Sequence, residues 1–197
     1  MRPNLTIVLV ALVAAGLGLM AGLTASGSPL LLRTEFGQRA LGWWMATTSS
    51  TPEGVAIARR GESLPAMTLA SLDGDRVDLP DTYAGRPLLI NVWASWCGPC
   101  VREMPALQRF AADQGGNGVQ VVGIALDDVE AVRAFVRHAG VRYPILIDAP
   151  GPADAGVRLG NPKGVLPYSV LVSGDGRLLK QHLGPFVEGE IVQWVHP

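Results

Sequence analysis

Two cysteines, Cys97 and Cys100, are separated by two residues, and the chain holds no other cysteine. An apolar run over residues 88–94 precedes the pair and a helical pattern follows it, which places Cys97 at the start of a helix. Unpaired backbone N–H groups and the positive end of the helix dipole favour a thiolate at that position. We therefore expect Cys97 to act as a nucleophile, and Cys100, one turn later, to resolve a mixed disulfide by forming the Cys97–Cys100 bond. Such an exchange requires no cofactor.

The same cysteines suit other kinds of site less well. A zinc site needs about four ligands, and the three histidines, His138, His182 and His196, lie at no ligand spacing from the pair. Covalent haem attachment needs a histidine directly after the second cysteine, where the chain has Val101. A purely structural disulfide is an alternative, although a bond that closes so short a loop restricts the unfolded chain little. We expect neither a metal nor a cofactor.

Periodic apolar residues predict the elements that position the cysteines. The run over residues 88–94 is nearly continuous, which is typical of a central parallel strand. Before it, strands over residues 67–72 and 76–79 flank an Asp-Gly turn and predict a hairpin. After it we expect a helix over 97–113, a strand over 119–126, a helix that ends near 139, a strand over 145–147, a helical turn over 153–159, a hairpin of strands over 168–172 and 177–183, and a last helix over 188–195. This order predicts an α/β domain with a mixed sheet whose early strands are parallel.

The helix after residue 126 has sequence signals at both of its ends. Asp127 and Glu130 are three residues apart, a spacing that resembles a capping box at a helix N-terminus. Gly140 is expected to end the helix, because glycine readily adopts the left-handed conformation found after a helix C-terminus. We therefore expect Asp127 to be the capping residue.

Residues 5–23 form an uncharged apolar run whose length matches the roughly 20 residues that cross a bilayer as a helix. Arg2 lies on the N-terminal side, so the positive-inside rule predicts a cytoplasmic N-terminus and export of the residues that follow. A cleaved signal peptide is the alternative, because small residues follow at 24–27, but the apolar region of such a peptide usually has only about 7 to 15 residues. We expect residues 1–25 to be a transmembrane anchor or an uncleaved signal.

Composition sets the organisation of the rest of the chain. Residues 26–60 are expected to form a linker, whose Trp43 and Trp44 either lie at the membrane surface or pack on the domain. Residues 61–197 suffice for one globular domain. The 197-residue chain has a formal net charge of -1, from 16 Lys and Arg against 17 Asp and Glu, so it lacks the basic excess typical of nucleic-acid binding.

Residues 93–100, Trp-Ala-Ser-Trp-Cys-Gly-Pro-Cys, resemble the active-site segment of the thioredoxin superfamily. Residues 61–65, Gly-Glu-Ser-Leu-Pro, and 100–105, Cys-Val-Arg-Glu-Met-Pro, are similar to the membrane-anchored TlpA/ResA-like branch, and the resemblance covers residues 61–195. It implies a thioredoxin fold, in which helices flank a mixed central sheet. It also implies an N-terminal hairpin and an inserted helix and strand over residues 128–148.

The resemblance further implies where a substrate binds. Leu166 and Pro167, just before a predicted strand, match the family's cis-proline loop, which lies against the cysteines and receives an extended substrate segment. Trp96, Gly98 and Pro99 are implied to complete the contact with the substrate. Without the resemblance, Pro167 would be assigned to an ordinary turn with a trans peptide bond.

Glu103 is the candidate proton acceptor. Thioredoxin has a buried aspartate six residues before its first cysteine, where this chain has Asn91. Glu103 follows Cys100 by three residues, and side chains at that spacing are neighbours on a helix. The resemblance implies that a glutamate here serves the active site, and we expect it to accept the proton of Cys100, which requires a buried carboxyl group with a raised pKa. An exposed glutamate on the helix surface is the alternative.

The resemblance implies a protein-disulfide reductase that acts on exported proteins, including apocytochromes c before haem attachment. An exported compartment is oxidising, so a membrane dithiol electron donor must keep the pair reduced. Gly98 and Pro99 match the thioredoxin dipeptide, and thioredoxin has a potential of about -270 mV, against about -120 mV for a strong oxidant. We expect a single-pass protein of the inner (cytoplasmic) membrane whose catalytic domain lies on the periplasmic side.

Two other functions stay open. A disulfide-forming oxidase would use the same cysteines at a higher potential. A non-catalytic binding module would hold partners near Pro167 and use the cysteines as a thiol-dependent latch. A peroxidase of related fold is disfavoured, because such enzymes typically have a threonine three residues before the reactive cysteine, where this chain has Ala94.

Overall fold

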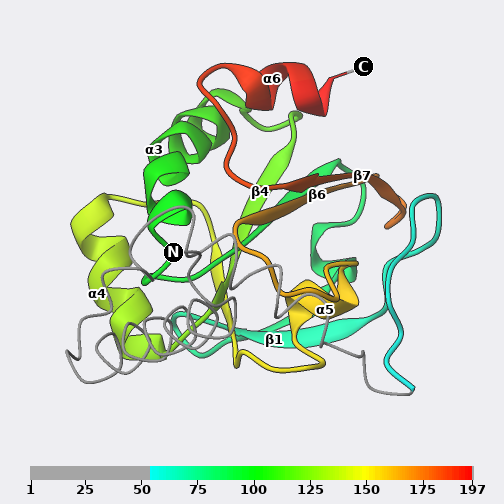
Figure 1. The fold of residues 1–197 in the computed structure, drawn as a ribbon. Helices are drawn as coiled ribbons and strands as arrows, with labels where there is room; N and C mark the ends of the chain where they lie inside the picture. Colours follow the sequence, from blue (N-terminus) through cyan, green and yellow to red (C-terminus); the bar gives the residue numbers. More distant parts are fainter. Residues whose placement is uncertain (1–53, 197) are drawn as a thin grey trace, which may run out of the picture. The chain divides into compact units, whose positions relative to one another are not determined.

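The computed structural model describes residues 54–196, which form one domain of helices packed against a sheet (Figure 1). The predicted anchor at residues 5–23 and most of the predicted linker, with Trp43 and Trp44, lie outside the described residues. None of the helices described is both long enough and apolar enough to cross a membrane.

The described elements follow the order expected from the sequence. In chain order they are β1 (Met67–Ser71), β2 (Arg76–Leu79), the 3-10 turn η2 (Asp81–Tyr83), β3 (Leu88–Trp93), α3 (Gly98–Asp113), β4 (Gln120–Leu126), α4 (Val129–Ala139), β5 (Ile145–Asp148), α5 (Ala155–Arg158), β6 (Tyr168–Val172), β7 (Leu178–Leu183) and α6 (Glu190–Val195). The predicted strands and helices are therefore confirmed, and η2 is an addition to them.

The strands form a seven-stranded sheet in the order β2-β1-β5-β4-β3-β6-β7. Strand β3 pairs in parallel with β4 and antiparallel with β6, and β4 pairs in parallel with β5. The β1-β2 and β6-β7 hairpins and the β1-β5 pair are antiparallel. The mixed sheet is confirmed. Because β3 ends at Trp93 and α3 begins at Gly98, the cysteines lie at the carboxyl end of an inner strand.

Two clusters of buried side chains cover the two faces of the sheet. All residues of β3 are buried, as its continuous apolar run predicts. Leu89 and Trp93 pack with side chains of α3 and α6 in a cluster that also contains both cysteines. Ile90 and Val92 pack on the opposite face with α5 and the N-terminal hairpin. The redox pair is therefore part of the core that joins α3 to the sheet.

The N-cap of α4 is Asp128, so the prediction that Asp127 caps this helix is wrong. The Oδ1 atom of Asp128 accepts a hydrogen bond from the backbone N–H of Glu130 at 3.0 Å. The Asp127 carboxylate is instead engaged by Ser95, which comes from the loop before the cysteines. The residue three positions after Asp128 is Ala131, so the capping-box spacing points to Asp127, while in the structure the Asp127 carboxylate is taken up by the contact with Ser95. Gly140 ends the helix with a φ of 67°, as predicted.

The packed domain begins before Gly61. Ala58 is buried, and its backbone N–H donates to the carbonyl oxygen of Arg158 at 2.8 Å. The backbone N–H of Gly61 donates to the carbonyl oxygen of Leu178, also at 2.8 Å. The last residues of the predicted linker therefore lie on the domain.

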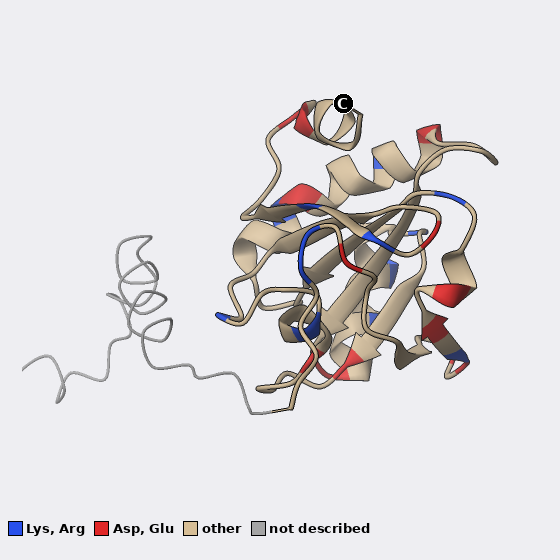
Figure 2. Ribbon diagram, turned by 90° about the vertical axis from the view of Figure 1, so that its right-hand side faces the viewer, with Lys and Arg blue, Asp and Glu red and all other residues tan. Residues whose placement is uncertain are grey.

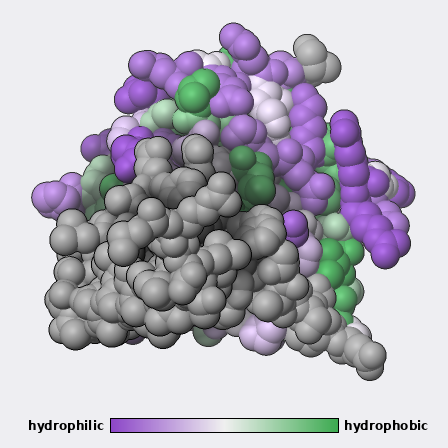
Figure 3. All heavy atoms as spheres, in the orientation of Figure 1, coloured by the Kyte–Doolittle hydropathy of each residue, from purple (hydrophilic) through white to green (hydrophobic). Residues whose placement is uncertain are grey.

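The surface of the domain carries charges of both signs, spread over loops and helices (Figure 2). In the face shown in Figure 3, hydrophobic residues of the described part lie in small groups between hydrophilic ones. Large hydrophobic side chains with substantial exposure are Trp96, Leu179, Leu183, Val187 and Val192. Trp96 is 69% exposed and directly precedes Cys97, so an accessible aromatic ring lies next to the redox pair.

Candidate active site

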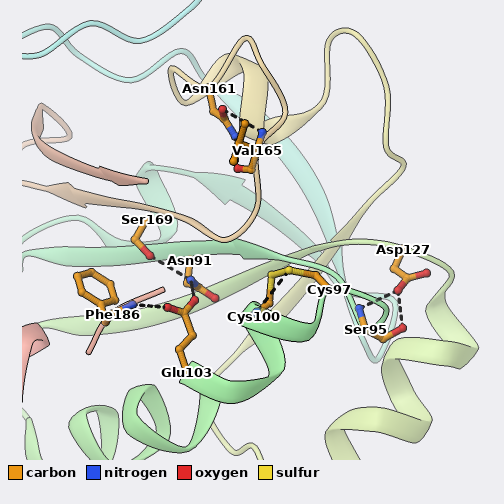
Figure 4. The surroundings of a disulfide bond; sticks show 10 residues. All are labelled: Asn91, Ser95, Cys97, Cys100, Glu103, Asp127, Asn161, Val165, Ser169 and Phe186. Carbon is orange, nitrogen blue, oxygen red and sulfur yellow. Dashed lines mark hydrogen bonds between the residues drawn. A yellow bond between two sulfur atoms is a disulfide. The ribbon is translucent and has the colours of Figure 1, made fainter. Parts of the chain in front are cut away.

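Cys97 and Cys100 form a disulfide at the N-terminus of α3 (Figure 4). Cys97 is the N-cap residue, and the backbone N–H of Cys100 donates to its Sγ atom at 3.3 Å. Pro99 lies in the first turn, where a backbone N–H would have no helical partner. Cys97 retains 6% of its surface exposed, whereas Cys100 has none. Of the two cysteines only Cys97 thus has any exposed surface, and the order in which they attack stays a prediction.

Asp127, at the end of β4, anchors the loop that leads into the cysteines. Its Oδ2 atom accepts hydrogen bonds from the backbone N–H and the hydroxyl of Ser95, at 2.9 and 2.6 Å (Figure 4). Partial burial opposes ionisation, but the bonds from Ser95 and from the Asp128 N–H hold the pKa of Asp127 below its ordinary value. Asp127 therefore stays ionised at neutral pH. The sequence offers one signal for this role, a carboxylate directly after a strand parallel to β3.

The Leu166–Pro167 peptide bond is cis, as the family resemblance implies, and the Leu79–Pro80 bond is also cis. Buried Asn161 holds the loop before Pro167, because its side chain donates to the Val165 carbonyl at 2.8 Å and accepts from the Val165 N–H at 3.3 Å (Figure 4).

Leu166 packs against the cluster that contains both cysteines. Pro167 is buried, and its carbonyl oxygen accepts a hydrogen bond from the Gly184 N–H at 2.9 Å. Around the disulfide, Trp96 and Gly98 are exposed and Pro99 is half-buried. The structure thus brings Leu166, from a distant part of the chain, to the cluster that contains the cysteines.

Glu103 is buried one turn after Cys100, with 3% of its surface exposed, which excludes the exposed-helix alternative. Its Oε1 atom accepts a hydrogen bond from Asn91 Nδ2 at 2.8 Å, and its Oε2 atom accepts one from the backbone N–H of Phe186 at 2.9 Å. Both bonds run to other elements rather than to a cysteine sulfur. The carboxylate is therefore held against β3 and the segment before α6 (Figure 4).

Burial raises the pKa of Glu103 from its ordinary value of 4.5 to about 7. The hydrogen bonds from Phe186 and Asn91 oppose this rise, and the negative charge of Glu190 adds to it. A carboxyl group with such a pKa gains and loses its proton at neutral pH, which is the property that a general base for a thiol requires.

Asn91 connects Glu103 to a third element. It is fully buried on β3, and its Nδ2 atom also donates to the Ser169 hydroxyl of β6 at 3.0 Å. Its Oδ1 atom has no hydrogen-bond partner among residues 54–196. The sequence singles out Asn91 only by comparison with thioredoxin, and it contains no local signal for Ser169 or Phe186, which reach the site through tertiary packing.

Within residues 54–196, no cluster of three or more His, Cys, Asp or Glu side chains has the arrangement of a metal site. The chemistry available to the described site is that of the two sulfurs, the carboxyl group of Glu103 and the helix N-terminus at Cys97.

Comparisons with known proteins agree with this geometry. The sequence model of the family described as Redoxin matches residues 59–193. The thiol-disulfide oxidoreductase ResA of Bacillus anthracis is 30% identical over 127 residues, which cover 63% of this chain and 69% of that protein. The thiol:disulfide interchange protein HelX of Rhodobacter capsulatus is 30% identical over 161 residues, which cover 78% of this chain and 85% of that protein.

A solved structure shows the same fold. The thioredoxin-related protein from Neisseria meningitidis serogroup B superposes with a TM-score of 0.57 at 32% sequence identity, covering 64% of this chain and 95% of that one. The match in fold, in sequence and in the paired cysteines leads to one conclusion. The chain belongs to the Redoxin family, and within the thioredoxin superfamily it is a TlpA/ResA-like thiol-disulfide oxidoreductase.

Proposed function

We propose that this oxidoreductase acts as a reductase of disulfides in exported proteins. The observation that carries the proposal is the disulfide closed around Gly98 and Pro99 at the N-terminus of α3. Thioredoxin has the same dipeptide between its cysteines and a potential of about -270 mV. A helix N-terminus stabilises the Cys97 thiolate, and the buried Cys100 is enclosed beside it.

The reaction transfers two electrons from the dithiol to the substrate. The Cys97 thiolate attacks one sulfur of the substrate disulfide, so a mixed disulfide forms and the other substrate sulfur leaves as a thiolate that takes a proton. Cys100 loses its proton and attacks Cys97 Sγ. The Cys97–Cys100 disulfide then forms and the second substrate thiolate leaves. The disulfide seen in the structure is the oxidised product, which a membrane dithiol donor must reduce before the next turnover.

We assign Glu103 as the base that accepts the Cys100 proton. The support is its burial and its pKa of about 7, raised by that burial, one helical turn after Cys100. Only the Cys100 thiolate is nucleophilic, so a nearby base speeds the resolving step.

An extended segment of the substrate is proposed to lie across Trp96, Gly98 and Pro99 on one side and Leu166 and Pro167 on the other. The exposure of Trp96 and the packing of Leu166 against the cysteine cluster support this placement. Main-chain contacts with the loop at Pro167 would orient the substrate sulfur toward Cys97.

We further propose that residues 5–23 anchor the chain in the inner membrane, with the catalytic domain on the periplasmic side. The uncharged run and Arg2 before it support this orientation. The partners in this proposal are a membrane dithiol donor and exported proteins with oxidised cysteines, among them apocytochromes c. Reporter enzymes fused after residue 197 test this orientation. We expect activity from a reporter that works only outside the cytoplasm. Activity from a reporter that works only in the cytoplasm would overturn the orientation.

The redox potential tests the direction of the reaction. Equilibration with glutathione or dithiothreitol buffers is expected to give a potential near that of thioredoxin, whereas a value above about -150 mV would assign the protein as a disulfide-forming oxidase.

Substrate turnover tests catalysis by the pair. Wild-type protein is expected to reduce insulin disulfides, and Cys97→Ser and Cys100→Ser are each expected to abolish turnover. Cys100→Ser is also expected to leave Cys97 in stable mixed disulfides, whose partners mass spectrometry identifies after expression in the cell. Partner binding without any turnover by the wild type would instead indicate a binding module.

A further inference from the structure

The Asn91 side chain lies between the Glu103 carboxylate and Cys100 in the view of Figure 4. Its Nδ2 atom donates to Glu103 Oε1 at 2.8 Å. Its Oδ1 atom is buried without a partner, and it is turned to the side on which Cys100 lies (Figure 4). A buried acceptor without a donor is costly, and the disulfide offers no donor. A reduced Cys100 carries a thiol hydrogen, so the reduced state supplies the donor that Oδ1 lacks.

The two states of the resolving step need opposite hydrogen-bond partners. Before proton transfer, the Cys100 thiol is a donor and the Glu103 carboxylate is an acceptor. After transfer, the Cys100 thiolate is an acceptor and the Glu103 carboxylic acid is a donor. An amide has one donating end and one accepting end, so it matches either state, provided that it turns over between them.

We infer that Asn91 is the positioning residue for this step, with its side-chain amide turning over when the proton passes from the Cys100 thiol to the Glu103 carboxylate. Before transfer, Nδ2 holds Glu103 and Oδ1 accepts from the thiol. After transfer, Oδ1 accepts from the protonated Glu103 and Nδ2 donates to the thiolate. The thiol proton itself becomes the proton of the Glu103 carboxylic acid, and both amide hydrogens stay on Nδ2, so charge and atoms balance. The inference rests on the proposed role of Glu103 as the base.

Ser169 fits both orientations of the amide. In the structure its hydroxyl accepts from Nδ2 at 3.0 Å. A hydroxyl both accepts and donates, so after the amide turns Ser169 can donate to Oδ1. An aspartate at position 91 would present acceptors at both ends and would match neither state. This requirement explains why a neutral amide, rather than the acid of thioredoxin, suits position 91.

Several groups that can carry a charge lie around this site. Cys100 comes from α3, and Glu190 from the first turn of α6 acts on Glu103 by its charge. Tyr143, just before β5, is buried, and burial and the charge of Glu103 both raise its pKa. His182 of β7 stacks on Phe186, whose N–H holds Glu103. Because these groups are close, Cys100 and Glu103 are expected to titrate as a coupled pair.

The first test uses the wild-type protein and asks whether the amide responds to the sulfur. The side-chain amide resonances of Asn91 are followed by NMR in the oxidised and reduced protein across the neutral pH range. Reduction is expected to move both amide protons, and in the reduced protein they are expected to follow the titration of the Glu103 carboxyl carbon. The nuclear Overhauser contact with Ser169 is expected to change with them. Resonances that reduction leaves in place would overturn the inference without any substitution.

The second test compares matched variants in a Cys97→Ser background, where Cys100 is the only thiol. Asn91→Leu keeps the size of the side chain and removes both polar ends. It is expected to move the titration midpoint of the Cys100 thiol upward by about one pH unit, the effect of one lost hydrogen bond to an ionised group. The control Ser169→Ala removes the other partner of Nδ2 and is expected to move the midpoint by less than about half as much.

Glu103→Gln in the same background separates the two proposals. If the Cys100 titration responds to Glu103→Gln and to Asn91→Leu, both stand. If it responds only to Glu103→Gln, Glu103 is the base and the role of Asn91 is overturned. If it does not respond to Glu103→Gln, the base assignment fails and the inference about Asn91 fails with it.

Discussion

Glu103 and Asp127 are two carboxylates that flank the Cys97–Cys100 disulfide on opposite sides and behave differently (Figure 4). Asp127 is half-buried at the end of β4, and hydrogen bonds from Ser95 contribute to a pKa below its ordinary value. Glu103 also accepts two hydrogen bonds, yet it is 3% exposed and its pKa rises to about 7. Burial, rather than the presence of hydrogen-bond donors, therefore decides which carboxylate titrates near neutral pH.

The two environments imply two roles. Asp127 keeps its charge and holds the backbone of the loop before Cys97, so it contributes geometry. Glu103 has a pKa of about 7, which suits the proposed role of accepting the Cys100 proton. Substitutions that remove each carboxylate should separate these roles. Replacing Glu103 should change the pH profile of the reaction, whereas replacing Asp127 should change the stability of the loop.

Among the substitutions of these carboxylates, Glu103→Gln is expected to have the largest effect on activity. Without the base, the rate of insulin reduction at neutral pH is expected to fall about 100-fold, the lower end of the range for general acid-base catalysis. The inflection of the wild-type pH–rate profile near the pKa of Glu103, about 7, is expected to disappear. Asp127→Asn is the control that should keep this inflection. An unchanged pH profile in Glu103→Gln would contradict the assignment of the base.

The same carboxyl group is expected to make stability depend on pH. Its pKa is raised from 4.5 to about 7 in the folded state, so the folded chain binds this proton more tightly than the unfolded chain. The contribution of Glu103 to stability is therefore greatest at low pH and declines as the pH rises through this range, by about 3 kcal/mol in total. Urea unfolding of the oxidised protein at about pH 4.5 and about pH 8 measures the loss. The Glu103→Gln variant should lack this loss of stability between the two pH values. An equal loss in that variant would assign the pH dependence to another group.

Asp127→Ala is expected to reduce the free energy of unfolding by about 2 kcal/mol, because two donors of Ser95 lose an ionised acceptor. Ser95→Ala removes only the hydroxyl bond and should cost about 1 kcal/mol. The pKa of Asp127 is depressed below 3.8, so its contribution is present above that pH and is lost as the pH falls through the folded pKa. Urea unfolding at neutral pH compares the variants. Equal losses of unfolding free energy in Asp127→Ala and Ser95→Ala would show that the hydrogen bond from the Ser95 backbone N–H contributes nothing.

Local sequence patterns predict most of the fold. The continuous apolar run of β3, the hairpin turns and the glycine after α4 each specify their element through nearest neighbours in the chain, and the structure confirms them. The junction of strand and helix that holds Cys97 is of the same kind, which is why the redox pair can be placed from the sequence.

The contacts around the cysteines are harder to predict because they join distant segments. Asp127 and Ser95 are 32 residues apart, and Phe186 is 83 residues from Glu103. Helix spacing correctly indicates that Glu103 follows Cys100 on α3, but it cannot show that the carboxylate binds Asn91 and Phe186. The spacing rule assigns the α4 cap to Asp127 because Glu130 lies three residues after it, and it cannot show that Ser95 engages the Asp127 carboxylate.

Asp128→Ala is expected to have the smallest effect and sharpens the comparison, since Asp128 is adjacent to Asp127 and has the same chemistry. Asp128 accepts from N–H groups in the first turn of α4, and loss of such a cap costs about 1 kcal/mol. The loss should be confined to α4, so urea unfolding should detect it while the redox potential and the rate of insulin reduction stay at wild-type values. If Asp128→Ala reduces the free energy of unfolding as much as Asp127→Ala does, then the α4 cap also holds the Asp127 carboxylate against Ser95, and the two aspartates act as one unit.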